Sequence, residues 1–393
     1  TTAKPDVTDA DTTGESVPPR DLAEHCRLRS KALLDAVRGV EKKDYLAASG
    51  LLKILDRAVE LASTEEQREQ VATFVSRLTR MVVGSPEEHQ KQRCLAALAG
   101  ADPGLFFPFC RGAAMPPEEG ARFYAALREE LNGRIPGRTG VVEQLSTFAA
   151  RRMIGDRSTR TPLLHGPPGA GKSELANQFA AAATAVGLPT AAVFQSLTQE
   201  GTRQEQPDMA LLGSSLHYNN GTTGLVYDTV SDPALRLGVV VLDEADKTNN
   251  RDYLVGLLDP KNPLQDHFVR EVMPAQDMRH KCLFILTAND TTRLGEGTAD
   301  PLWSRLDPLH LRPYERDELV DLGTMALTRS VNTPYCPSID LARSVIREAL
   351  DELGDGANFR AILDLANQKL FYELLLSTGT VNQRPGRQAP PVA

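Results

Sequence analysis

The stretch Gly166-Pro-Pro-Gly-Ala-Gly-Lys172-Ser173 decides the fold of this chain of 393 residues. It fits the pattern G-x-x-x-x-G-K-[S/T], in which the glycines let backbone N–H groups surround a phosphate group. An apolar strand pattern over Pro162–His165 precedes it, and a helical pattern over Glu174–Thr184 follows it. This strand–loop–helix context predicts a site for ATP, with Lys172 on the β- and γ-phosphates and the Ser173 hydroxyl as a ligand of Mg²⁺.

A second motif places two carboxylates at the end of an apolar strand. Val239–Leu242 are apolar, and Asp243 and Glu244 follow directly. Ligands of parallel sheets bind at the carboxyl ends of the strands. We therefore expect Asp243 to hold Mg²⁺ and Glu244 to polarise the attacking water. Two adjacent acids after a strand are also common in solvated turns, but the phosphate loop upstream favours the catalytic interpretation.

The remaining pattern predicts an α/β fold between two helical regions. Short apolar strands alternate with helices, which indicates a parallel sheet covered on both faces. The predicted strands are Pro162–His165, Thr190–Phe194, Gly238–Leu242 and Cys282–Thr287. The predicted domains are a disordered tail (1–18), an N-terminal all-α domain with its linker (19–116), a large α/β domain (117–311), a helical lid (312–376) and a disordered tail (377–393).

Several further motifs resemble the ATPase module of Lon-family proteases, which belongs to the AAA+ class. They occur in that family's order over about residues 134–376, and they are Asp243-Glu244-Ala245-Asp246-Lys247, Leu257-Leu258-Asp259-Pro260, Gln265-Asp266-His267-Phe268, Ile285-Leu286-Thr287-Ala288-Asn289 and Pro301-Leu302-Trp303-Ser304-Arg305-Leu306.

This resemblance implies additional site residues and a homo-oligomer. Asn289 would be a sensor that orients the attacking water, and Arg305 would act in trans on the nucleotide of a neighbouring subunit, in a ring of six as the family expectation. Arg360 would be a second sensor on the lid. The nucleotide-binding set that motif and resemblance imply together is Ile135, Gly166, Pro168, Gly169, Ala170, Gly171, Lys172, Ser173, Glu174 and Arg360.

The chain also departs from the Lon pattern. Only a short polar stretch follows the lid, so we do not expect this chain to be a protease itself. The family's aromatic-aliphatic-Gly step, which grips polypeptide, aligns with Leu211-Leu212-Gly213 and lacks the aromatic residue. Tyr218 either substitutes for it or is an ordinary loop tyrosine. The loop between Asn289 and Arg305 is longer than in the family.

Composition excludes several classes of protein. The formal net charge of −8 disfavours a surface that coats nucleic acid. No apolar run is long enough for a membrane span, and Thr1–Pro19 does not have the pattern of a secretory signal, so we expect a cytoplasmic protein. The five cysteines lack the spacing of a zinc site, which predicts free thiols.

Three functions remain open, and all of them use ATP. The first is a ring-forming remodeller, unfoldase or chaperone that acts on a protein client. The second is a nucleic-acid-linked ATPase, as in mobile-element or phage-defence machinery, which the acidic charge and the aromatic content of 5% disfavour. The third is a scaffold in which nucleotide only controls assembly, which the filled catalytic positions disfavour.

Overall fold

The computed structural model describes nine ranges of the chain: 42–84, 88–197, 207–218, 221–248, 251–272, 276–297, 299–329, 338–354 and 358–377. The predicted tail 1–18, nearly all of the predicted tail 377–393, and Cys26 and Cys336 lie outside these ranges. Ser377 is the exception, since it is the last residue of a helix. By packing, the chain forms two compact units: unit 1 comprises 1–113, 209–233 and 264–278, and unit 2 comprises 114–208, 234–263 and 279–393.

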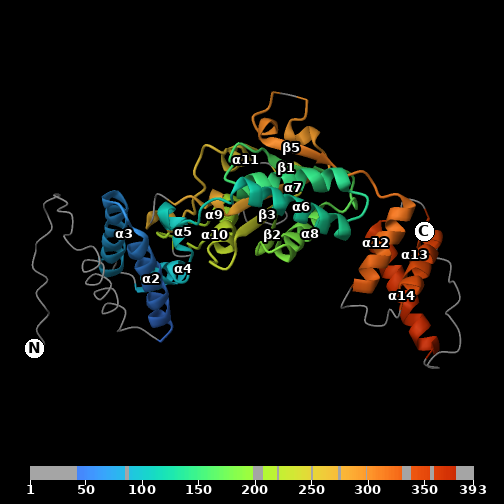
Figure 1. Ribbon diagram of the computed structural model, residues 1–393, viewed down its shortest axis with the longest axis horizontal. Helices are drawn as coiled ribbons and strands as arrows, with labels where there is room; N and C mark the ends of the chain where they lie inside the picture. Colours follow the sequence, from blue (N-terminus) through green and yellow to red (C-terminus); the bar gives the residue numbers. More distant parts are fainter. Residues whose placement is uncertain are drawn as a thin grey trace, which may run out of the picture. The chain divides into compact units, whose positions relative to one another are not determined.

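Unit 2 contains a parallel sheet of five strands in the order β2-β3-β4-β1-β5 (Figure 1). The strands are β1 Thr161–His165, β2 Thr190–Ser196, β3 Leu237–Asp243, β4 Cys282–Ala288 and β5 Leu306–His310. The four predicted strands and the α/β class are confirmed. The sequence pattern missed β5 because Asp307 and Pro308 interrupt its apolar residues. Proline is tolerated there because β5 is an edge strand.

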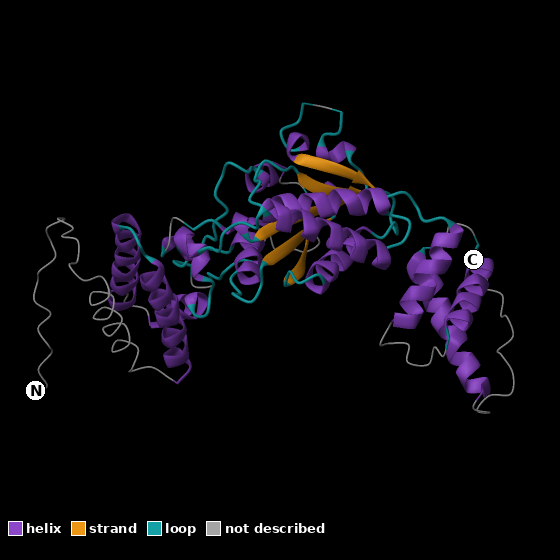
Figure 2. Cartoon of the chain, in the orientation of Figure 1, coloured by secondary structure: helices purple, strands orange, loops and turns teal. Residues whose placement is uncertain are grey.

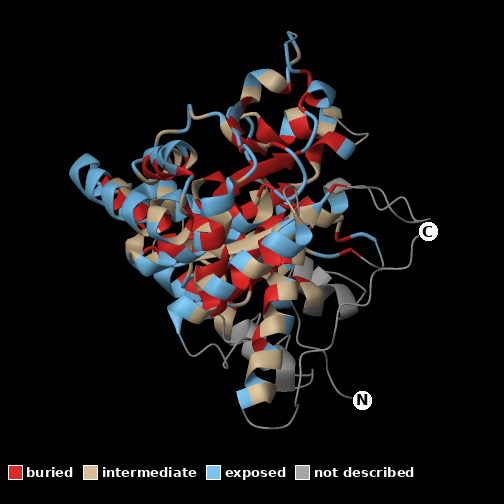
Figure 3. Ribbon diagram, turned by 90° about the vertical axis from the view of Figure 1, so that its right-hand side faces the viewer, coloured by how far each residue is buried: buried red, intermediate tan, exposed pale blue. Residues whose placement is uncertain are grey.

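The central strands are buried on both faces, as their continuous apolar runs require. All seven residues of β4 are buried, and only the last residue of β3 is not. Three helices, α6 Pro117–Arg134, α7 Thr139–Met153 and α8 Lys172–Ala185, share one core with Val239, Val241, Leu283 and Ile285. The alternate residues of the same strands are buried on the opposite face. Figure 2 shows helices around the strands, and Figure 3 shows the ribbon of the central strands in the colour of buried residues.

The region predicted as a lid contains three helices, and these helices belong to unit 2. They are α12 Arg316–Arg329, α13 Ile339–Leu353 and α14 Phe359–Ser377. The side chain of Ser338 caps α13 by accepting a hydrogen bond from the backbone N–H of Leu341 at 3.1 Å. The three helices bury an apolar core of their own, which includes Leu327, Ile346 and Ile362. The lid therefore has the interior of a small helical domain.

Unit 1 combines the N-terminal helices with two later segments. It contains α2 Lys42–Leu61, α3 Glu65–Gly84, α4 Glu88–Leu98, α5 Pro103–Phe106 and the 3-10 turn η1 Pro108–Cys110, together with α10 Leu225–Val230, the turn η3 Val269–Glu271 and the end of α9 Pro207–Leu212. The Tyr227 hydroxyl donates to the Ala97 carbonyl at 2.8 Å, and the Asp102 N–H donates to the Ser231 carbonyl at 2.8 Å. The domain limits predicted from the sequence stay a prediction, because packing alone does not test independent folding.

The remaining short elements are η2 Ala245–Lys247, α11 Arg251–Leu258, η4 Met278–His280, η5 Thr292–Leu294 and η6 Trp303–Arg305. None of the helices in the described ranges combines the length and apolar character that a bilayer span requires.

Candidate active site

The phosphate loop joins the end of β1 to the start of α8. Gly171 is the N-cap of α8 and has a left-handed φ of 86°. Gly166 has a φ of 149°, and a β-carbon at this position would lie 2.2 Å from the Leu311 carbonyl oxygen. Both positions therefore require glycine. The loop directs the N-terminus of α8, with its unpaired N–H groups, at any phosphate bound there.

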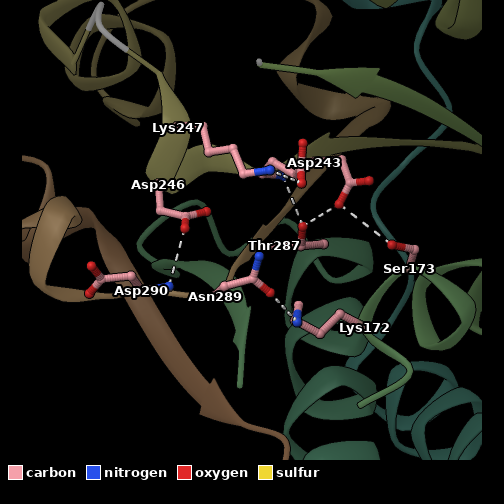
Figure 4. A network of polar contacts seen from close by, with 9 residues as sticks. Lys172, Ser173, Asp243, Asp246, Lys247, Thr287, Asn289 and Asp290 are labelled. Atoms are coloured by element: carbon pink, nitrogen blue, oxygen red, sulfur yellow. Dashed lines mark hydrogen bonds and ion pairs between the residues drawn. The ribbon is translucent and has the colours of Figure 1, made fainter. Parts of the chain in front are cut away.

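Lys172 connects this loop to the end of β4. Its ammonium group donates hydrogen bonds to the carbonyls of Gly166 at 2.9 Å and Pro167 at 3.0 Å, and to Asn289 Oδ1 at 2.8 Å (Figure 4). Burial lowers the pKa of Lys172, while the nearby carboxylates, Asp243 foremost, oppose this shift. The predicted phosphate ligand and the predicted sensor are therefore in direct contact.

Asp243 lies at the end of β3, next to Ser173 and Thr287. The Ser173 hydroxyl donates to Asp243 Oδ1 at 3.5 Å. The Thr287 hydroxyl also donates to this oxygen, and it accepts from the Glu244 N–H at 3.1 Å. Sequence reasoning missed Thr287, although the strand register could have found it. Leu242 pairs with Leu286, so the next residues along β3 and β4 are neighbours.

These oxygens fit Mg²⁺ in composition. A hydroxyl and a carboxylate are hard ligands, and Mg²⁺ in ATPases binds one or two such groups, several waters and substrate phosphate. Across the described ranges, no group of three or more His, Cys, Asp and Glu residues could hold a metal by itself. The Ser173 hydroxyl and the Asp243 carboxylate therefore fit a metal that binds together with its nucleotide.

Glu244 has an unusual backbone and a cationic partner. Its φ of 57° is the only positive value at a non-glycine residue in the described ranges. Such a conformation costs about 1–3 kcal/mol and persists where the surroundings impose it. The carboxylate forms an ion pair with Lys247, three residues on in η2. The predicted catalytic glutamate is therefore held beside Asp243 but engaged by a lysine.

The acidic motif continues into a contact with the residue that follows Asn289. Asp246 is 7% exposed and accepts a hydrogen bond from the Asp290 N–H at 3.2 Å. Asp290 directly follows Asn289, the predicted sensor. Figure 4 shows these residues on adjoining turns after β3 and β4. This bond fixes the two strand ends that carry Glu244 and Asn289 relative to one another.

Two histidines stand on neighbouring strands beside the loop. The rings of His165 on β1 and His310 on β5 lie 5.0 Å apart between centroids. Burial lowers the pKa of His165, and the proximity of His310 and Lys172 adds to this effect. The nearby charge of Glu296 opposes this shift. No sequence motif signals this pair, because it depends on the β1–β5 register.

Arg305 lies in a different cluster of the same chain. It donates to Asp259 Oδ2 at 2.7 Å and to the Pro301 carbonyl at 2.7 Å, and both partners lie outside the group in Figure 4. A backbone N–H from Lys261 and the guanidinium of Arg305 hold the pKa of Asp259 below its usual value. The structure therefore shows a positioned arginine that the predicted site of the same chain does not use.

The other residues predicted to contact the nucleotide differ in their burial and in their position relative to the loop. Ile135 is the C-cap of α6 and shares the buried core with Ala170. Glu174 lies in the first turn of α8 and accepts a hydrogen bond from Gln178 at 2.7 Å. Arg360 is exposed near the start of α14. Asn358, two residues before Arg360, lies close to the loop, since a β-carbon at Gly169 would lie 3.6 Å from its Cβ.

Arg138 is a second residue that sequence reasoning missed. It precedes α7, is only 4% exposed, and donates to the Ala170 carbonyl in the phosphate loop at 3.2 Å. A single arginine before a helix carries no sequence signal of such a contact. The approach of the loop and the helix in the folded chain creates it.

The comparisons agree with this geometry. Residues 162–306 match the family described as "AAA domain (dynein-related subfamily)". The match begins in β1, includes the phosphate loop and the acidic motif, and ends where β5 begins. No curated protein matches the chain. The family match supports an AAA+ ATPase, and the finer likeness to the Lon module stays a prediction. Residues 162–306 are thus similar to an AAA domain, and the parallel five-stranded sheet is that of an α/β P-loop NTPase.

Proposed function

We propose that this protein is an Mg²⁺-dependent ATPase that assembles into a ring and uses ATP hydrolysis to remodel a protein client. The observation that carries the proposal is the convergence of three strand ends. Lys172 after β1 contacts Asn289 after β4, and Ser173 contacts Asp243 at the end of β3. This arrangement supports the proposal, because the residues predicted to bind phosphate, to bind the metal and to orient water lie together at the carboxyl end of the sheet.

The residues divide the chemistry among them. Lys172 exchanges its carbonyl partners for the β- and γ-phosphates, and Ser173 and Asp243 hold Mg²⁺. When bound, Mg²⁺ supplies positive charge where negative charge develops on the phosphate oxygens. Glu244 separates from Lys247 and accepts a proton from the attacking water, which Asn289 orients. Positioning and electrostatics of this kind account for most of the rate in phosphoryl transfer.

The position of Arg305 supports the ring in this proposal. Its guanidinium is held by Asp259 and by a backbone carbonyl of its own chain. We propose that Arg305 completes the site of a neighbouring subunit, where an arginine of this kind accelerates hydrolysis by about 10³–10⁵. In this arrangement each subunit is an incomplete ATPase, and a ring of six is our working assembly.

The client-binding surface in this proposal centres on Tyr218. Leu211 is 0% exposed, and the Leu212 carbonyl accepts a hydrogen bond from the His267 N–H at 2.6 Å, so this part of the predicted grip is engaged in packing. Tyr218 is 56% exposed. An exposed aromatic ring offers the apolar contact that grips an extended polypeptide. These observations favour Tyr218 over Leu211 as the gripping residue.

The test uses a permanently unfolded soluble polypeptide and the full chain. Glu244→Gln should bind ATP while its hydrolysis falls by at least about a hundredfold, because the general base is lost. Glu129→Gln, at an exposed site on α6, is the matched control.

The unfolded polypeptide should stimulate the wild-type ATPase, and Tyr218→Ala should lose this stimulation. His217→Ala, its exposed neighbour, should retain it.

Each part of the proposal can fail separately. Normal turnover by Glu244→Gln would refute the assigned site. ATP hydrolysis that single-stranded DNA stimulates, and unfolded polypeptide does not, would move the function to a nucleic-acid-linked ATPase. Turnover below about one per hour, against roughly 10 per second for a typical enzyme, would indicate a nucleotide-controlled scaffold.

A further inference from the structure

Arg138 is a buried cation that touches the phosphate loop. Its Nη2 donates to the Ala170 carbonyl, and its guanidinium carbon lies 3.8 Å from the centroid of the Tyr314 ring. Its Nε is buried and has no hydrogen-bond partner among the described residues. Removing a charged group from water is costly unless it gains compensating interactions. The cost of burying this charge suggests that Arg138 has a function in addition to packing.

Tyr314 lies in the short segment between β5, which ends at His310, and α12, which begins at Arg316. We call this segment, residues 311–315, the hinge of the lid. The ring of Tyr314 also approaches the loop, since a β-carbon at Gly171 would lie 3.4 Å from its Cε2. One aromatic side chain of the hinge therefore lies against both Arg138 and the phosphate loop.

The first turn of α12 is tied to the same place through Glu318. Arg312 forms two hydrogen bonds with this carboxylate, at 2.6 and 2.7 Å, and the Glu315 N–H donates to it at 2.8 Å. The bonds from Arg312 are the largest cause of the lowered pKa of Glu318, and the charge of Arg138 contributes. Arg138 thus acts electrostatically on the first helix of the lid.

The turn before Arg138 leaves no free space beside this carboxylate. Gly137 has a φ of 78°, and a β-carbon there would lie 2.2 Å from Glu318 Oε1. The backbone next to Arg138 is therefore in close contact with α12. A shift of α12 has to displace Arg138, Tyr314 or the Arg312–Glu318 pair.

We propose that Arg138 is a positioning residue that connects the phosphate loop to the hinge of the lid through the ring of Tyr314, so that nucleotide on the loop sets the position of α12. The proposal rests on the proposed function only in requiring that the loop binds nucleotide. A bound nucleotide brings several negative charges close to the Ala170 carbonyl. The guanidinium then redistributes its donors between that carbonyl and the new charge, and the stacked tyrosine follows it.

The structure offers both a conservative series and a matched control. Arg138→Met removes the charge and keeps the length, and Arg138→Lys keeps the charge without the planar fork. Tyr314→Phe retains the ring, and Tyr314→Leu removes it. Arg128 lies 5.5 Å from the centroid of Tyr124 on α6, so Arg128→Met breaks an arginine–tyrosine contact that does not involve the loop.

The experiment measures deuterium uptake in peptides covering 316–323 of the full-length protein, with and without a slowly hydrolysed ATP analogue. The dissociation constant and the thermal unfolding of each variant are measured in parallel. We expect the analogue to slow exchange in the wild type, Tyr314→Phe and Arg128→Met. Arg138→Met and Tyr314→Leu should bind the analogue about tenfold more weakly and, at saturation, lose the slowing. Arg138→Lys should restore part of it.

A double-mutant cycle separates coupling from two independent effects. Arg138→Met combined with Tyr314→Leu should weaken binding no more than either change alone. Full slowing of exchange in a saturated Arg138→Met protein would overturn the proposal. A folded Arg138→Met protein that binds no analogue would also overturn it, because Arg138 would then be a ligand and not a link. If the wild type binds no nucleotide, the proposed function itself fails.

Discussion

The hydroxyl of Thr287 donates a hydrogen bond to the carboxylate of Asp243. These residues are the penultimate residue of β4 and the last residue of β3, so the sheet register itself orients the predicted Mg²⁺ ligand. The same hydroxyl accepts from the Glu244 N–H, which places one side chain between the metal ligand and the catalytic base.

Thr287→Val should therefore raise the Mg²⁺ concentration needed for half-maximal ATPase activity by about 10- to 100-fold, as losses of hydrogen bonds to metal ligands typically do. The substitution keeps the shape of the side chain and removes only its hydroxyl. Thr287→Ser should stay within about threefold of the wild type by the same reasoning. A Mg²⁺ titration of steady-state hydrolysis provides the measurement, and an unchanged midpoint in Thr287→Val would exclude a positioning role.

Lys172→Ala should abolish nucleotide binding. The change removes the cation at the phosphate loop and leaves the carbonyls of Gly166 and Pro167 and the Asn289 amide without their donor. Binding of a fluorescent ATP analogue checks this. Lys53→Ala, at an exposed position on α2, should bind like the wild type. Comparable affinity in the two variants would contradict the assignment of the loop.

Lys247→Met should increase hydrolysis in the absence of client. The ion pair engages the carboxylate that has to activate water, so its loss makes Glu244 available. The Lys247 and Glu244 side chains are 44% and 33% exposed, which limits the strength of the pair. At about 0.2–1 kcal/mol for exposed pairs, the rise in kcat should be at most about fivefold. A fall in kcat would mean that Lys247 instead holds Glu244 in its working position.

Arg305→Ala should lower hydrolysis by about three orders of magnitude and should be rescued by mixing. In a mixed ring, an Arg305→Ala subunit retains its loop, and a Lys172→Ala neighbour supplies the arginine. Mixtures of the two inactive proteins should regain activity in proportion to the mixed interfaces formed. If each protein is inactive alone and the mixture is also inactive, Arg305 does not act in trans.

Asp266 should make unit 1 respond to pH. Its carboxylate accepts backbone hydrogen bonds from Gly224 at 2.7 Å and from Phe268 and Val269, both at 2.9 Å, while burial raises its pKa to about 7. Because its pKa is raised in the folded state, Asp266 binds a proton more tightly in the folded protein than in the unfolded chain, and protonation therefore stabilises the fold. Its contribution to the free energy of unfolding is therefore largest near the unfolded pKa, about 4, and is lost as pH rises through about 7.

Urea unfolding of the wild type and of Asp266→Asn at several pH values measures this contribution. Asn carries no charge at any pH, so other titrating groups cancel in the difference between the two proteins. The wild type should gain stability relative to Asp266→Asn as the pH falls from about 8 to 5. A difference that does not change over this range would show that Asp266 does not have the raised pKa on which the prediction rests.

Much of the site could be predicted because its chemistry is local in sequence. The loop containing Lys172, the strand before Asp243 and the buried run before Asn289 each have their own pattern. Thr287 and Arg138 were missed because strand register and tertiary packing give them their roles. Strand β5 was missed because an edge strand does not need a continuous apolar run. The exposure of Tyr218 beside the buried Leu211 likewise depends on packing.

Because unit 1 is built from three separate segments of the chain, the protein cannot be cut into its two units at one position. The chain passes between the two units after residues 113, 208, 233, 263 and 278. Tyr227, which is 1% exposed, donates to Ala97, and the Arg93 guanidinium lies 5.4 Å from the Phe268 ring. Removal of the N-terminal helices would uncover these side chains within the AAA region. The N-terminal helices therefore cannot be replaced by those of another protein through a single fusion point. Such a chimera also has to include the two later segments of unit 1, residues 209–233 and 264–278.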